Sequence, residues 1–308
     1  MGEIINFGGK EIKYKPKKEQ KTENFISLLP QLRTLKDEVV IISINEEVEN
    51  NEMLLKSVIK EVITLKCMGV ITILVANSNS KIEEYFNENQ GVKKLFEQNI
   101  FTNSTGLTDV LEVIVKHDSV NKISNEIKQY NVISMALSGN DMNIILSDDV
   151  LNNNVENLTF TRKSINSFQK PEKKYSIDTL NELLKTEIIP IVIPTFQDNN
   201  KNEYIMESKM FAMYLAKYLN ALKYVLIYSD NKSIPTACIY GVERFTKIIK
   251  QNNFDTKTLS IFNSAIEAVK NGVQGAHIID VNQTSLLEEL CNCDAGGLFL
   301  YDDTLNQL

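Results

Sequence analysis

The sequence predicts an α/β fold built on a mostly parallel sheet. Two apolar segments of strand length, Val39–Ile44 and Ile71–Ala76, flank a longer segment of helical periodicity, Glu52–Met68. That order is typical of a strand–helix–strand unit with parallel strands. The strand candidates after residue 185 are apolar on both faces, as buried parallel strands are. The alternation continues along the chain without repeats or heptads.

The first predicted elements are a basic arm and a bent helix. Residues 1–23 are polar and rich in lysine, which predicts a flexible arm or a segment that contacts other subunits. Asn24–Leu35 has apolar residues at helical spacing around Pro30, and a proline inside a helix bends or breaks it. In Glu52–Met68 the apolar residues share one face, and Gly69 suits the position just after a helix end.

The later elements follow the same alternation. Ser80 and Glu83 have the spacing of a capping box, which predicts a short helix that ends near Phe86. The other predicted helices are Asp109–Lys116, Asn121–Gln129, Asp178–Lys185, Glu207–Ala221, Lys257–Lys270 and Ser285–Cys291. The other predicted strands are Val132–Leu137, Asn143–Leu146, Ile188–Ile193, Tyr224–Tyr228, Ala276–Ile279 and Leu298–Tyr301. The predicted loops include Thr195–Glu203 and Ser229–Pro235.

A boundary between two lobes is predicted near the middle of the chain. Lys163–Lys174 is polar and contains Pro171, as linkers often are. We therefore expect an N-terminal lobe at residues 24–170 and a C-terminal lobe at residues 171–308.

Composition narrows the class of function. The formal net charge of −7 and the pI of about 5.2 argue against nucleic acid and against an anionic membrane as partners. Four cysteines make no disulfide framework in 308 residues, and two histidines are too few for a typical zinc site, so no metal is expected. The start of the chain lacks the pattern of a signal peptide, and no apolar run approaches ~18 residues. A cytoplasmic protein is expected.

Polar residues occupy the loops where an α/β sheet usually binds ligands. The loop after each strand receives the ligand, and glycines there let the backbone approach a phosphate. Here the first strand runs into Asn45-Glu46-Glu47 and the second into Asn77-Ser78-Asn79-Ser80. Asn and Ser side chains both donate and accept hydrogen bonds, so Asn77 and Ser78 are candidate substrate-binding residues.

Three segments match motifs of a known family. Asn24–Ile42 is similar to its first helix and strand, Leu137–Asp141 (LSGND) to its LSGKDG turn, and Ala268–Asp280 to its ALKGGV…HIID stretch. On these motifs, across roughly residues 24–301, the chain resembles the amino acid kinase family and within it the acetylglutamate kinases. The resemblance implies a three-layer α/β/α sandwich around a mostly parallel open sheet. It also implies that the N-terminal half binds the acyl amino acid and the C-terminal half binds ATP.

The positions that do chemistry in that family carry other residues here. The family's first strand ends in Lys-x-Gly-Gly, whose lysine stabilises the transferred phosphoryl group; Ser43, Asn45 and Glu46 align there. The Gly-Gly loop for the acetylated substrate aligns with Asn77 and Ser78, and the arginine for the substrate carboxylate with Gly106.

The C-terminal half departs from the family in the same way. Its Asn-x-Asn-x-Asp motif aligns with Tyr204, Met206 and Ser208, or, with a shift of one residue, places Glu207 at the acidic position. Its second catalytic lysine aligns with Ile261. Lys257 lies one helical turn earlier. We therefore assign no catalytic residue.

Four residues remain as candidates for contacts with a nucleotide cofactor: Ser138, Gly139, Ser229 and Asp230. Ser138-Gly139 is either a remnant of a phosphate-facing loop or a tight turn, and Ser229-Asp230 either lines the nucleotide pocket or forms a surface turn. Glu83 fits a solvated helix face, and Tyr228 fits packing in the core.

Three functions remain open. The first is a kinase-like protein that has lost phosphoryl transfer and acts as a scaffold, a metabolite-binding protein or a regulatory subunit. It would work as a homo-oligomer or with a related kinase. The second is a divergent acyl amino acid kinase of arginine biosynthesis that uses ATP and Mg²⁺, with Lys209 and Lys257 replacing the lost lysines. The third is a sensor of a free amino acid such as arginine.

Overall fold

The computed structural model describes residues 3–7, 10–14, 28–77, 79–89, 105–139, 141–142, 145–146, 168–169, 182–197, 203–229, 234–235, 237–292 and 295–303. Two of the candidate site residues, Ser78 and Asp230, lie outside these ranges.

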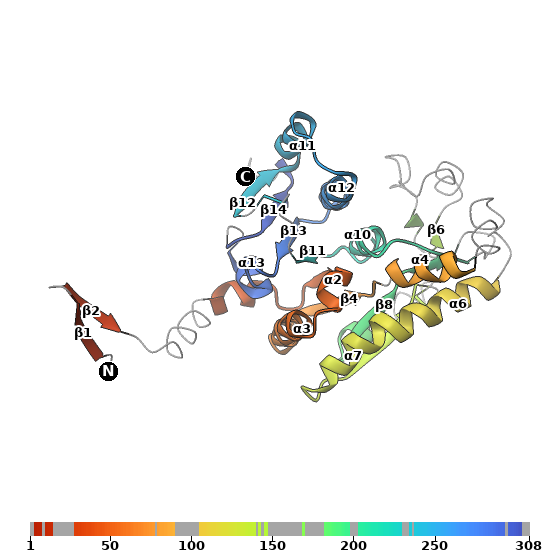
Figure 1. Ribbon diagram of the computed structural model, residues 1–308, viewed down its shortest axis with the longest axis horizontal. Helices are drawn as coiled ribbons and strands as arrows, with labels where there is room; N and C mark the ends of the chain where they lie inside the picture. Colours follow the sequence, from red (N-terminus) through yellow and green to blue (C-terminus); the bar gives the residue numbers. More distant parts are fainter. Residues whose placement is uncertain are drawn as a thin grey trace.

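An eight-stranded sheet forms the centre of the molecule (Figure 1). Its strands are β3 (Val39–Ile44), β4 (Ile71–Val75), β5 (Ser134–Ser138), β8 (Ile189–Ile193), β11 (Lys223–Tyr228), β12 (Cys238–Gly241), β13 (Gly275–Asp280) and β14 (Leu298–Tyr301). They lie in the order β12-β14-β13-β11-β3-β4-β8-β5. All neighbours from β13 to β5 are parallel, whereas β14 runs antiparallel to β13 and parallel to β12. The predicted mostly parallel sheet is confirmed.

Helices cover both faces of this sheet. They are α2 (Glu46–Glu49), α3 (Glu52–Cys67), α4 (Asn79–Glu88), α6 (Thr105–Val115), α7 (Asn121–Lys128), α10 (Ser208–Tyr218), α11 (Val242–Gln251), α12 (Thr256–Lys270) and α13 (Leu286–Cys291). A π-helical turn, η2 (Lys116–Val120), joins α6 to α7, and residues 28–34 form a further helix that contains Pro30.

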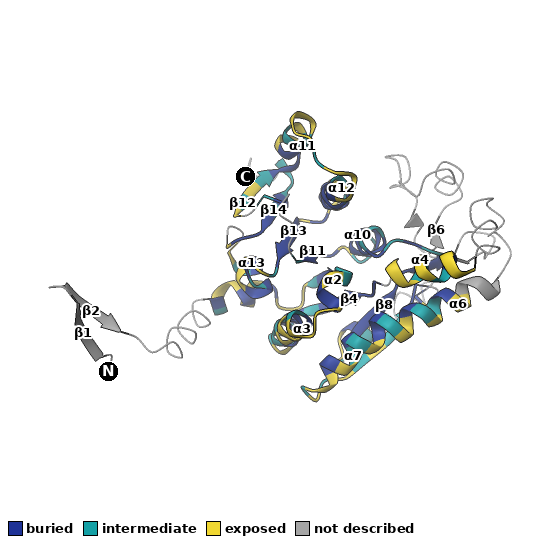
Figure 2. Ribbon diagram, viewed as in Figure 1, coloured by how far each residue is buried: buried dark blue, intermediate teal, exposed yellow. Residues whose placement is uncertain are grey.

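Strand β3 shows why the molecule has three layers. Side chains of a strand alternate between its two faces. Ile41 belongs to the core cluster that contains Phe211 of α10 and Phe262 of α12, whereas Ile42 belongs to the cluster that contains Ile59 of α3. Figure 2 shows the buried residues concentrated in the strands, with exposed residues on the outer faces of the helices. The α/β/α sandwich is confirmed.

Local signals in the sequence set the ends of the longest helices. The Asn51 side chain accepts hydrogen bonds from the backbone N–H groups of Met53 and Leu54, at 3.1 and 3.2 Å, and so caps α3. Gly69 follows the helix with a φ of 84°, a conformation that glycine adopts at low cost. The helix predicted for Glu52–Met68 is confirmed to within one residue.

Two predictions about local structure were wrong. Helix α4 begins at Asn79, so Ser80 lies inside the helix and does not cap it. The predicted loop Thr195–Glu203 contains strand β9 (Thr195–Gln197) and leads into strand β10 (Glu203–Ile205), which pair antiparallel. Such short strands are held by pairing and burial, which the local pattern does not reveal.

The described residues also form two smaller sheets. Strand β6 (Ile145–Leu146) and β7 (Phe168–Gln169) join β9 and β10 in the order β10-β9-β6-β7. Strand β7 lies within the predicted boundary Lys163–Lys174, whose other residues are outside the described ranges. Within the predicted N-terminal arm, β1 (Glu3–Phe7) and β2 (Lys10–Tyr14) form an antiparallel hairpin of their own. Part of that arm therefore has regular secondary structure.

The topology predicts a ligand site at the carboxyl ends of β3 and β11. These two strands are parallel neighbours in the sheet. The sheet extends in opposite directions from this pair. Strand β4, which follows β3 through α3, lies beyond β3, and strand β13 lies beyond β11. In open α/β sheets, ligands bind where the strand order reverses in this way.

Candidate functional site

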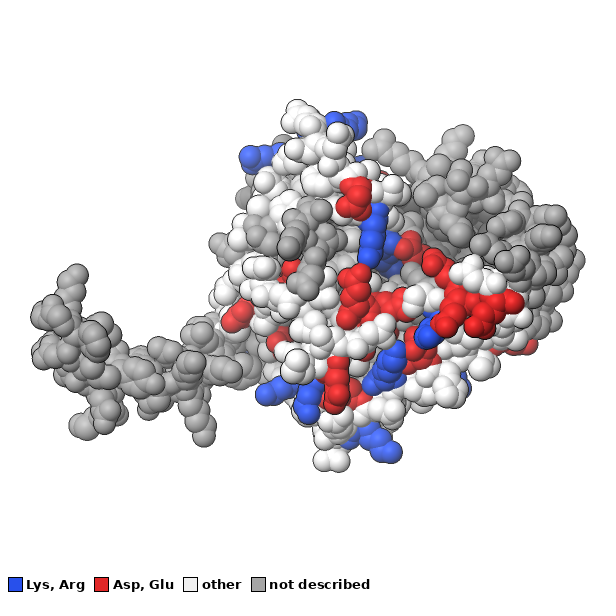
Figure 3. Space-filling view, viewed as in Figure 1, with Lys and Arg blue, Asp and Glu red and all other residues white. Residues whose placement is uncertain are grey.

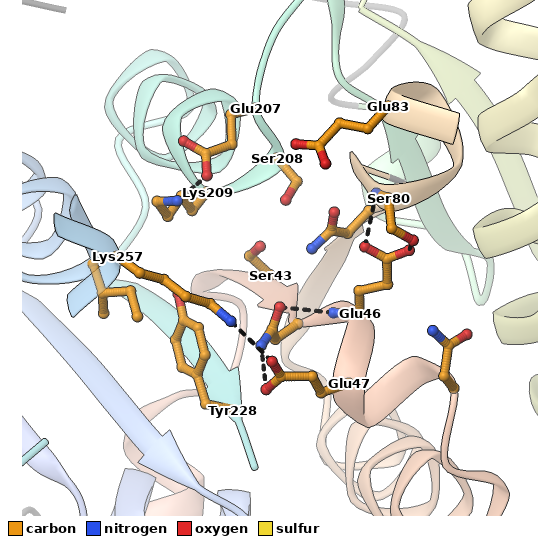
Figure 4. Close-up of a pocket in the computed structure, with 14 residues that line it drawn as sticks. Ser43, Glu46, Glu47, Ser80, Glu83, Glu207, Ser208, Lys209, Tyr228 and Lys257 are labelled. Atoms are coloured by element: carbon orange, nitrogen blue, oxygen red, sulfur yellow. Dashed lines mark hydrogen bonds and ion pairs between the residues drawn. The ribbon is translucent and has the colours of Figure 1, made fainter. Parts of the chain in front are cut away.

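A pocket of about 470 Å³ opens at the carboxyl ends of β3, β4 and β11 (Figure 4). It is lined by Ser43, Asn45, Glu46, Glu47, Asn50, Asn77, Ser80, Glu83, Glu207, Ser208, Lys209, Tyr228, Lys257 and Ile261. These residues come from both halves of the chain. We refer to this cavity as the central pocket.

The central pocket is lined by residues that align with catalytic positions of the family. Ser43, Ser208 and Ile261, which stand where the family has a lysine, an aspartate and a lysine, all line it. Asn45 and Asn77, from the two loops that lack glycine, line it as well. The structure thus brings together residues from four separate segments of the sequence.

Two buried serines point into the central pocket. Ser43 is 4% exposed and Ser208 is 2% exposed. Figure 4 shows both hydroxyl groups directed into the cavity, and neither side chain has a hydrogen-bond partner within the described part of the chain. Buried hydroxyl groups are normally hydrogen-bonded. These two are therefore available to a ligand or to water.

Tyr228 forms part of the wall of the central pocket. It is the last residue of β11 and is buried, and burial raises the pKa of its phenol group. The sequence suggested only a packing role. Its position at the carboxyl end of a central strand was the signal that marked it as a pocket residue.

The loop after β3 is tied to helix α4 through Glu46. The Asn45 side chain accepts a hydrogen bond from the Glu46 backbone N–H at 2.8 Å and so starts helix α2. The Glu46 carboxylate in turn accepts hydrogen bonds from the backbone N–H of Ser80, at 3.1 Å, and from its hydroxyl group. A carboxylate from another element therefore serves the N-terminus of α4, where a capping box was predicted.

A hydrogen bond to the π-helical turn η2 fixes the loop after β4. Asn77 is 7% exposed, and its backbone N–H donates a hydrogen bond to Oγ of Ser119 at 3.0 Å. Ser119 lies in the π-helical turn η2, a type of turn that is frequent near functional sites. Asn77 therefore has a fixed position at the pocket wall, and its predicted contact with a substrate stays a prediction.

The two lysines of the central pocket are each paired with a glutamate. Nζ of Lys257 lies 2.9 Å from Oε1 of Glu47, and Lys209 forms an ion pair with Glu207. Burial, and secondly the charge on Lys257, lowers the pKa of Lys209 to about 8. Both lysines were named from the sequence as replacements for the family's catalytic lysines, and both reach the pocket.

Negative charge predominates around the central pocket. Its lining contains four carboxylates, from Glu46, Glu47, Glu83 and Glu207, against the two lysines, which leaves two net negative formal charges. Figure 3 shows acidic side chains gathered over α2 and α4, with few basic ones between them. This field repels phosphate and carboxylate groups and attracts cations.

The predicted cofactor residues Ser138 and Gly139 form a closed turn outside the lining of the central pocket. The Ser138 N–H donates to Oδ2 of Asp141 at 2.8 Å, and the Asp141 N–H donates to Oγ of Ser138 at 3.0 Å. The Gly139 N–H donates to Oγ1 of Thr195 at 3.1 Å and to the carbonyl oxygen of Ile193 at 3.2 Å. These groups already have partners, which favours the interpretation as a tight turn.

Gly139 is required by a close approach of two backbone segments. A Cβ atom at this position would lie 1.7 Å from the carbonyl oxygen of Thr195. Ser229 directly follows β11, and Asp230 is outside the described ranges. A contact of Ser138, Gly139, Ser229 or Asp230 with a nucleotide stays a prediction.

Two further features concern metals and membranes. Within the described ranges, no three or more His, Cys, Asp or Glu side chains are grouped so that they could hold a metal ion. Among the helices of those same residues, none combines the length and the apolar character needed to cross a lipid bilayer.

Similar sequences come from acetylglutamate kinases. The chain is 26% identical over 288 residues to the acetylglutamate kinase of Nitrosomonas eutropha, a match that covers 91% of this chain and 96% of the relative. It is 22% identical over 287 residues to the acetylglutamate kinase of Campylobacter curvus, with 91% and 98% covered. The resemblance found in the sequence motifs is confirmed.

Solved structures share the fold at low sequence identity. N-acetylglutamate synthase from Neisseria gonorrhoeae, complexed with coenzyme A and L-arginine, superposes with a TM-score of 0.62 at 14% identity. That match covers 92% of this chain but only 65% of the synthase chain. Carbamate kinase from Giardia lamblia bound to AMP-PNP gives a TM-score of 0.56 at 11% identity, with 86% and 99% covered.

A family model that matches most of the chain identifies the family. The sequence model described as the amino acid kinase family matches residues 4–280. Together with the eight-stranded sheet and the relatives above, this match shows that the chain belongs to the amino acid kinase family.

Proposed function

We propose that this chain is an acetylglutamate kinase-like protein that no longer transfers phosphoryl groups and acts as a non-catalytic metabolite-binding or regulatory subunit. The observation that carries the proposal is the lining of the central pocket. Ser43, Ser208 and Ile261 occupy the positions where the family resemblance places charged catalytic residues. None of these three side chains carries a charge.

The physical reason is that phosphoryl transfer depends on positioned positive charge and backbone donors. The loss of a single such group typically costs about 10²–10³-fold in rate. Here both lysines of the pocket face a glutamate partner, and the carboxylates outnumber them. A bound triphosphate would have to displace these partners and enter a field of its own sign.

A non-catalytic member of the family would act through an assembly, with itself or with a related active kinase, in the cytoplasm. The edge of the main sheet supports this part of the proposal. Strand β5 lies last in the strand order, and Met135 on it is 39% exposed, while the adjacent Ile133 is 67% exposed. Exposed apolar groups beside a sheet edge favour association with another chain.

The alternative function is a divergent acyl amino acid kinase of arginine biosynthesis. One observation favours it, because Lys209 and Lys257 both line the central pocket. On this alternative, ATP with Mg²⁺ would draw the two ammonium groups away from Glu207 and Glu47 to its own phosphates. The predicted consequence is a rate that depends on each lysine.

Release of ADP separates the two functions. Purified chain is incubated with ATP–Mg²⁺ and N-acetylglutamate, beside Lys257→Met and Lys209→Met variants and an active acetylglutamate kinase as positive control. We expect ADP release at the background level, equal in all three forms of this chain. Release that requires the acyl amino acid and is lost in either variant would overturn the proposal and establish the divergent kinase.

A further inference from the structure

The central pocket has features that select a ligand by its charge. Its volume of about 470 Å³ is within the range of small-molecule sites. Its net formal charge is negative, and within the described residues each of its lysines is already paired with a glutamate. A carboxylate or a phosphate would therefore find no cation available to it there. A cation would be attracted.

Glu83 supplies a carboxylate that the described residues leave without a partner. The other three carboxylates of the pocket are engaged, Glu46 by Ser80, Glu47 by Lys257 and Glu207 by Lys209. Glu83 is exposed at the pocket rim and has no ion pair or hydrogen bond within the described part of the chain. Figure 4 shows its carboxylate pointing into the cavity, toward Ser208.

Ser43 and Ser208 provide a second, independent sign of a ligand. Both are more than nine-tenths buried, both point into the cavity, and both lack a hydrogen-bond partner among the described residues. A buried hydroxyl oxygen accepts hydrogen bonds well from an N–H group. Because both hydroxyl groups face the cavity, a ligand with N–H donors can reach them.

The arrangement of the pocket carboxylates favours an organic ligand over a bare metal ion. Carboxylates and hydroxyl groups would suit a hard divalent cation. However, the pocket carboxylates come from α2, α4 and the start of α10, and no three acidic, His or Cys side chains of the described residues are grouped to ligate a metal. An extended molecule with several N–H donors can reach these separated groups.

We propose that the central pocket binds a small organic cation, an ammonium or guanidinium compound that carries neither carboxylate nor phosphate. Glu83 is its counter-charge, and the hydroxyl groups of Ser43 and Ser208 accept its hydrogen bonds. This inference rests on the proposed loss of phosphoryl transfer, since an active kinase needs the same pocket for two anions.

The test is a titration of the full chain with agmatine and with 1,4-diaminobutane. Binding is measured by isothermal titration calorimetry, and the melting temperature is measured with and without each amine. N-acetylglutamate, ATP–Mg²⁺, MgCl₂ and NaCl at matched ionic strength are the comparison solutes. We expect saturable binding of at least one of the two amines, a rise in melting temperature of several degrees, and no saturable effect of the other solutes.

The variants locate the site. Glu83→Gln is expected to weaken binding of the amine about tenfold or more, the loss typical of one charged hydrogen bond. Because Glu83 is exposed, this variant keeps the fold. The matched control is Glu84→Gln, which makes the same chemical change on the next residue of α4, outside the central pocket. It is expected to bind like the unaltered chain.

Three outcomes would overturn the inference. They are no saturable binding of either amine, equal binding in Glu83→Gln and the unaltered chain, or an equal effect of MgCl₂. Failure here leaves the proposed loss of catalysis standing, because that is judged by ADP release. Conversely, ADP release with saturable binding of ATP–Mg²⁺ would refute the loss of catalysis and this inference together.

Discussion

Lys257 and Glu47 form an ion pair across the central pocket, with 2.9 Å between Nζ and Oε1. The pair joins α12 in the C-terminal half to α2 in the N-terminal half, over 210 positions of sequence. The Lys257 and Glu47 side chains are 64% and 52% exposed, respectively. The ion pair therefore links the two halves of the chain. Because both side chains are exposed to solvent, the pair is expected to be weak.

We expect this pair to contribute less than about 1 kcal/mol to the free energy of unfolding, as exposed ion pairs do. The measurement is a double-mutant cycle with Lys257→Met, Glu47→Gln and the double variant, followed by urea denaturation at low and high salt. The coupling energy is expected to fall as salt screens the pair. A coupling above about 2 kcal/mol that salt does not change would contradict this expectation.

Glu46 is expected to stabilise the first turn of helix α4. Its carboxylate accepts the Ser80 backbone N–H, one of the groups that a helix start leaves without a partner. Glu46→Ala should destabilise this turn by about 1 kcal/mol, the typical value of a cap. The measurement is amide hydrogen exchange, which should become faster in α4. Glu47→Ala is the matched control, and equal exchange in both variants would contradict this role.

Many of the regular elements were predictable because their patterns are local, although β12 and α11 were not among the predicted elements. Val39–Ile44 is apolar at every position except Ser43, and Glu52–Cys67 carries most of its apolar residues on one face. Strand β9 and the cap of α4 were not predictable in this way. The first depends on pairing with β10, and the second on a carboxylate 34 residues away. Interactions between distant segments leave no periodic pattern in the sequence.

The candidate site was partly predictable, through the family resemblance. It named Ser43, Asn77 and Ile261 as residues of one site, and they do line one pocket. It gave no sign of Glu83, because a glutamate on an exposed helix face has the same sequence pattern whether or not a pocket lies beside it. Its place in the pocket lining is seen only in the structure.

Gly139 is expected to be indispensable for the turn after β5. A Cβ atom there would lie 1.7 Å from the carbonyl oxygen of Thr195, so Gly139→Ala must displace backbone. We expect a loss of about 1–3 kcal/mol in the free energy of unfolding, measured by urea denaturation. Gly272→Ala is the comparison. A Cβ atom added at Gly272 would meet no other atom within 4 Å, but the φ of Gly272 is 100°. The Gly272→Ala variant therefore tests backbone strain alone. A neutral Gly139→Ala would refute the steric argument.

Lys209 is expected to make stability depend on pH in the alkaline range. In the folded chain its pKa is lowered to about 8, mainly by burial, whereas the pKa of an unfolded lysine is about 10.4. Between these two values the unfolded chain binds more protons than the folded chain. The free energy of unfolding therefore rises with pH in this window, by at most about 1.4 kcal/mol per pH unit from this group.

Lys209→Met keeps most of the aliphatic length and removes the titrating group. When this variant and the unaltered chain are denatured with urea from about pH 7 to pH 10, the free energy of unfolding of the variant should lack this rise. Glu207→Gln removes the negative partner of Lys209, which should lower the pKa further and move the window to lower pH. Equal pH profiles for Lys209→Met and the unaltered chain would mean that Lys209 keeps an ordinary pKa. The central pocket would then hold its charge unchanged across this range.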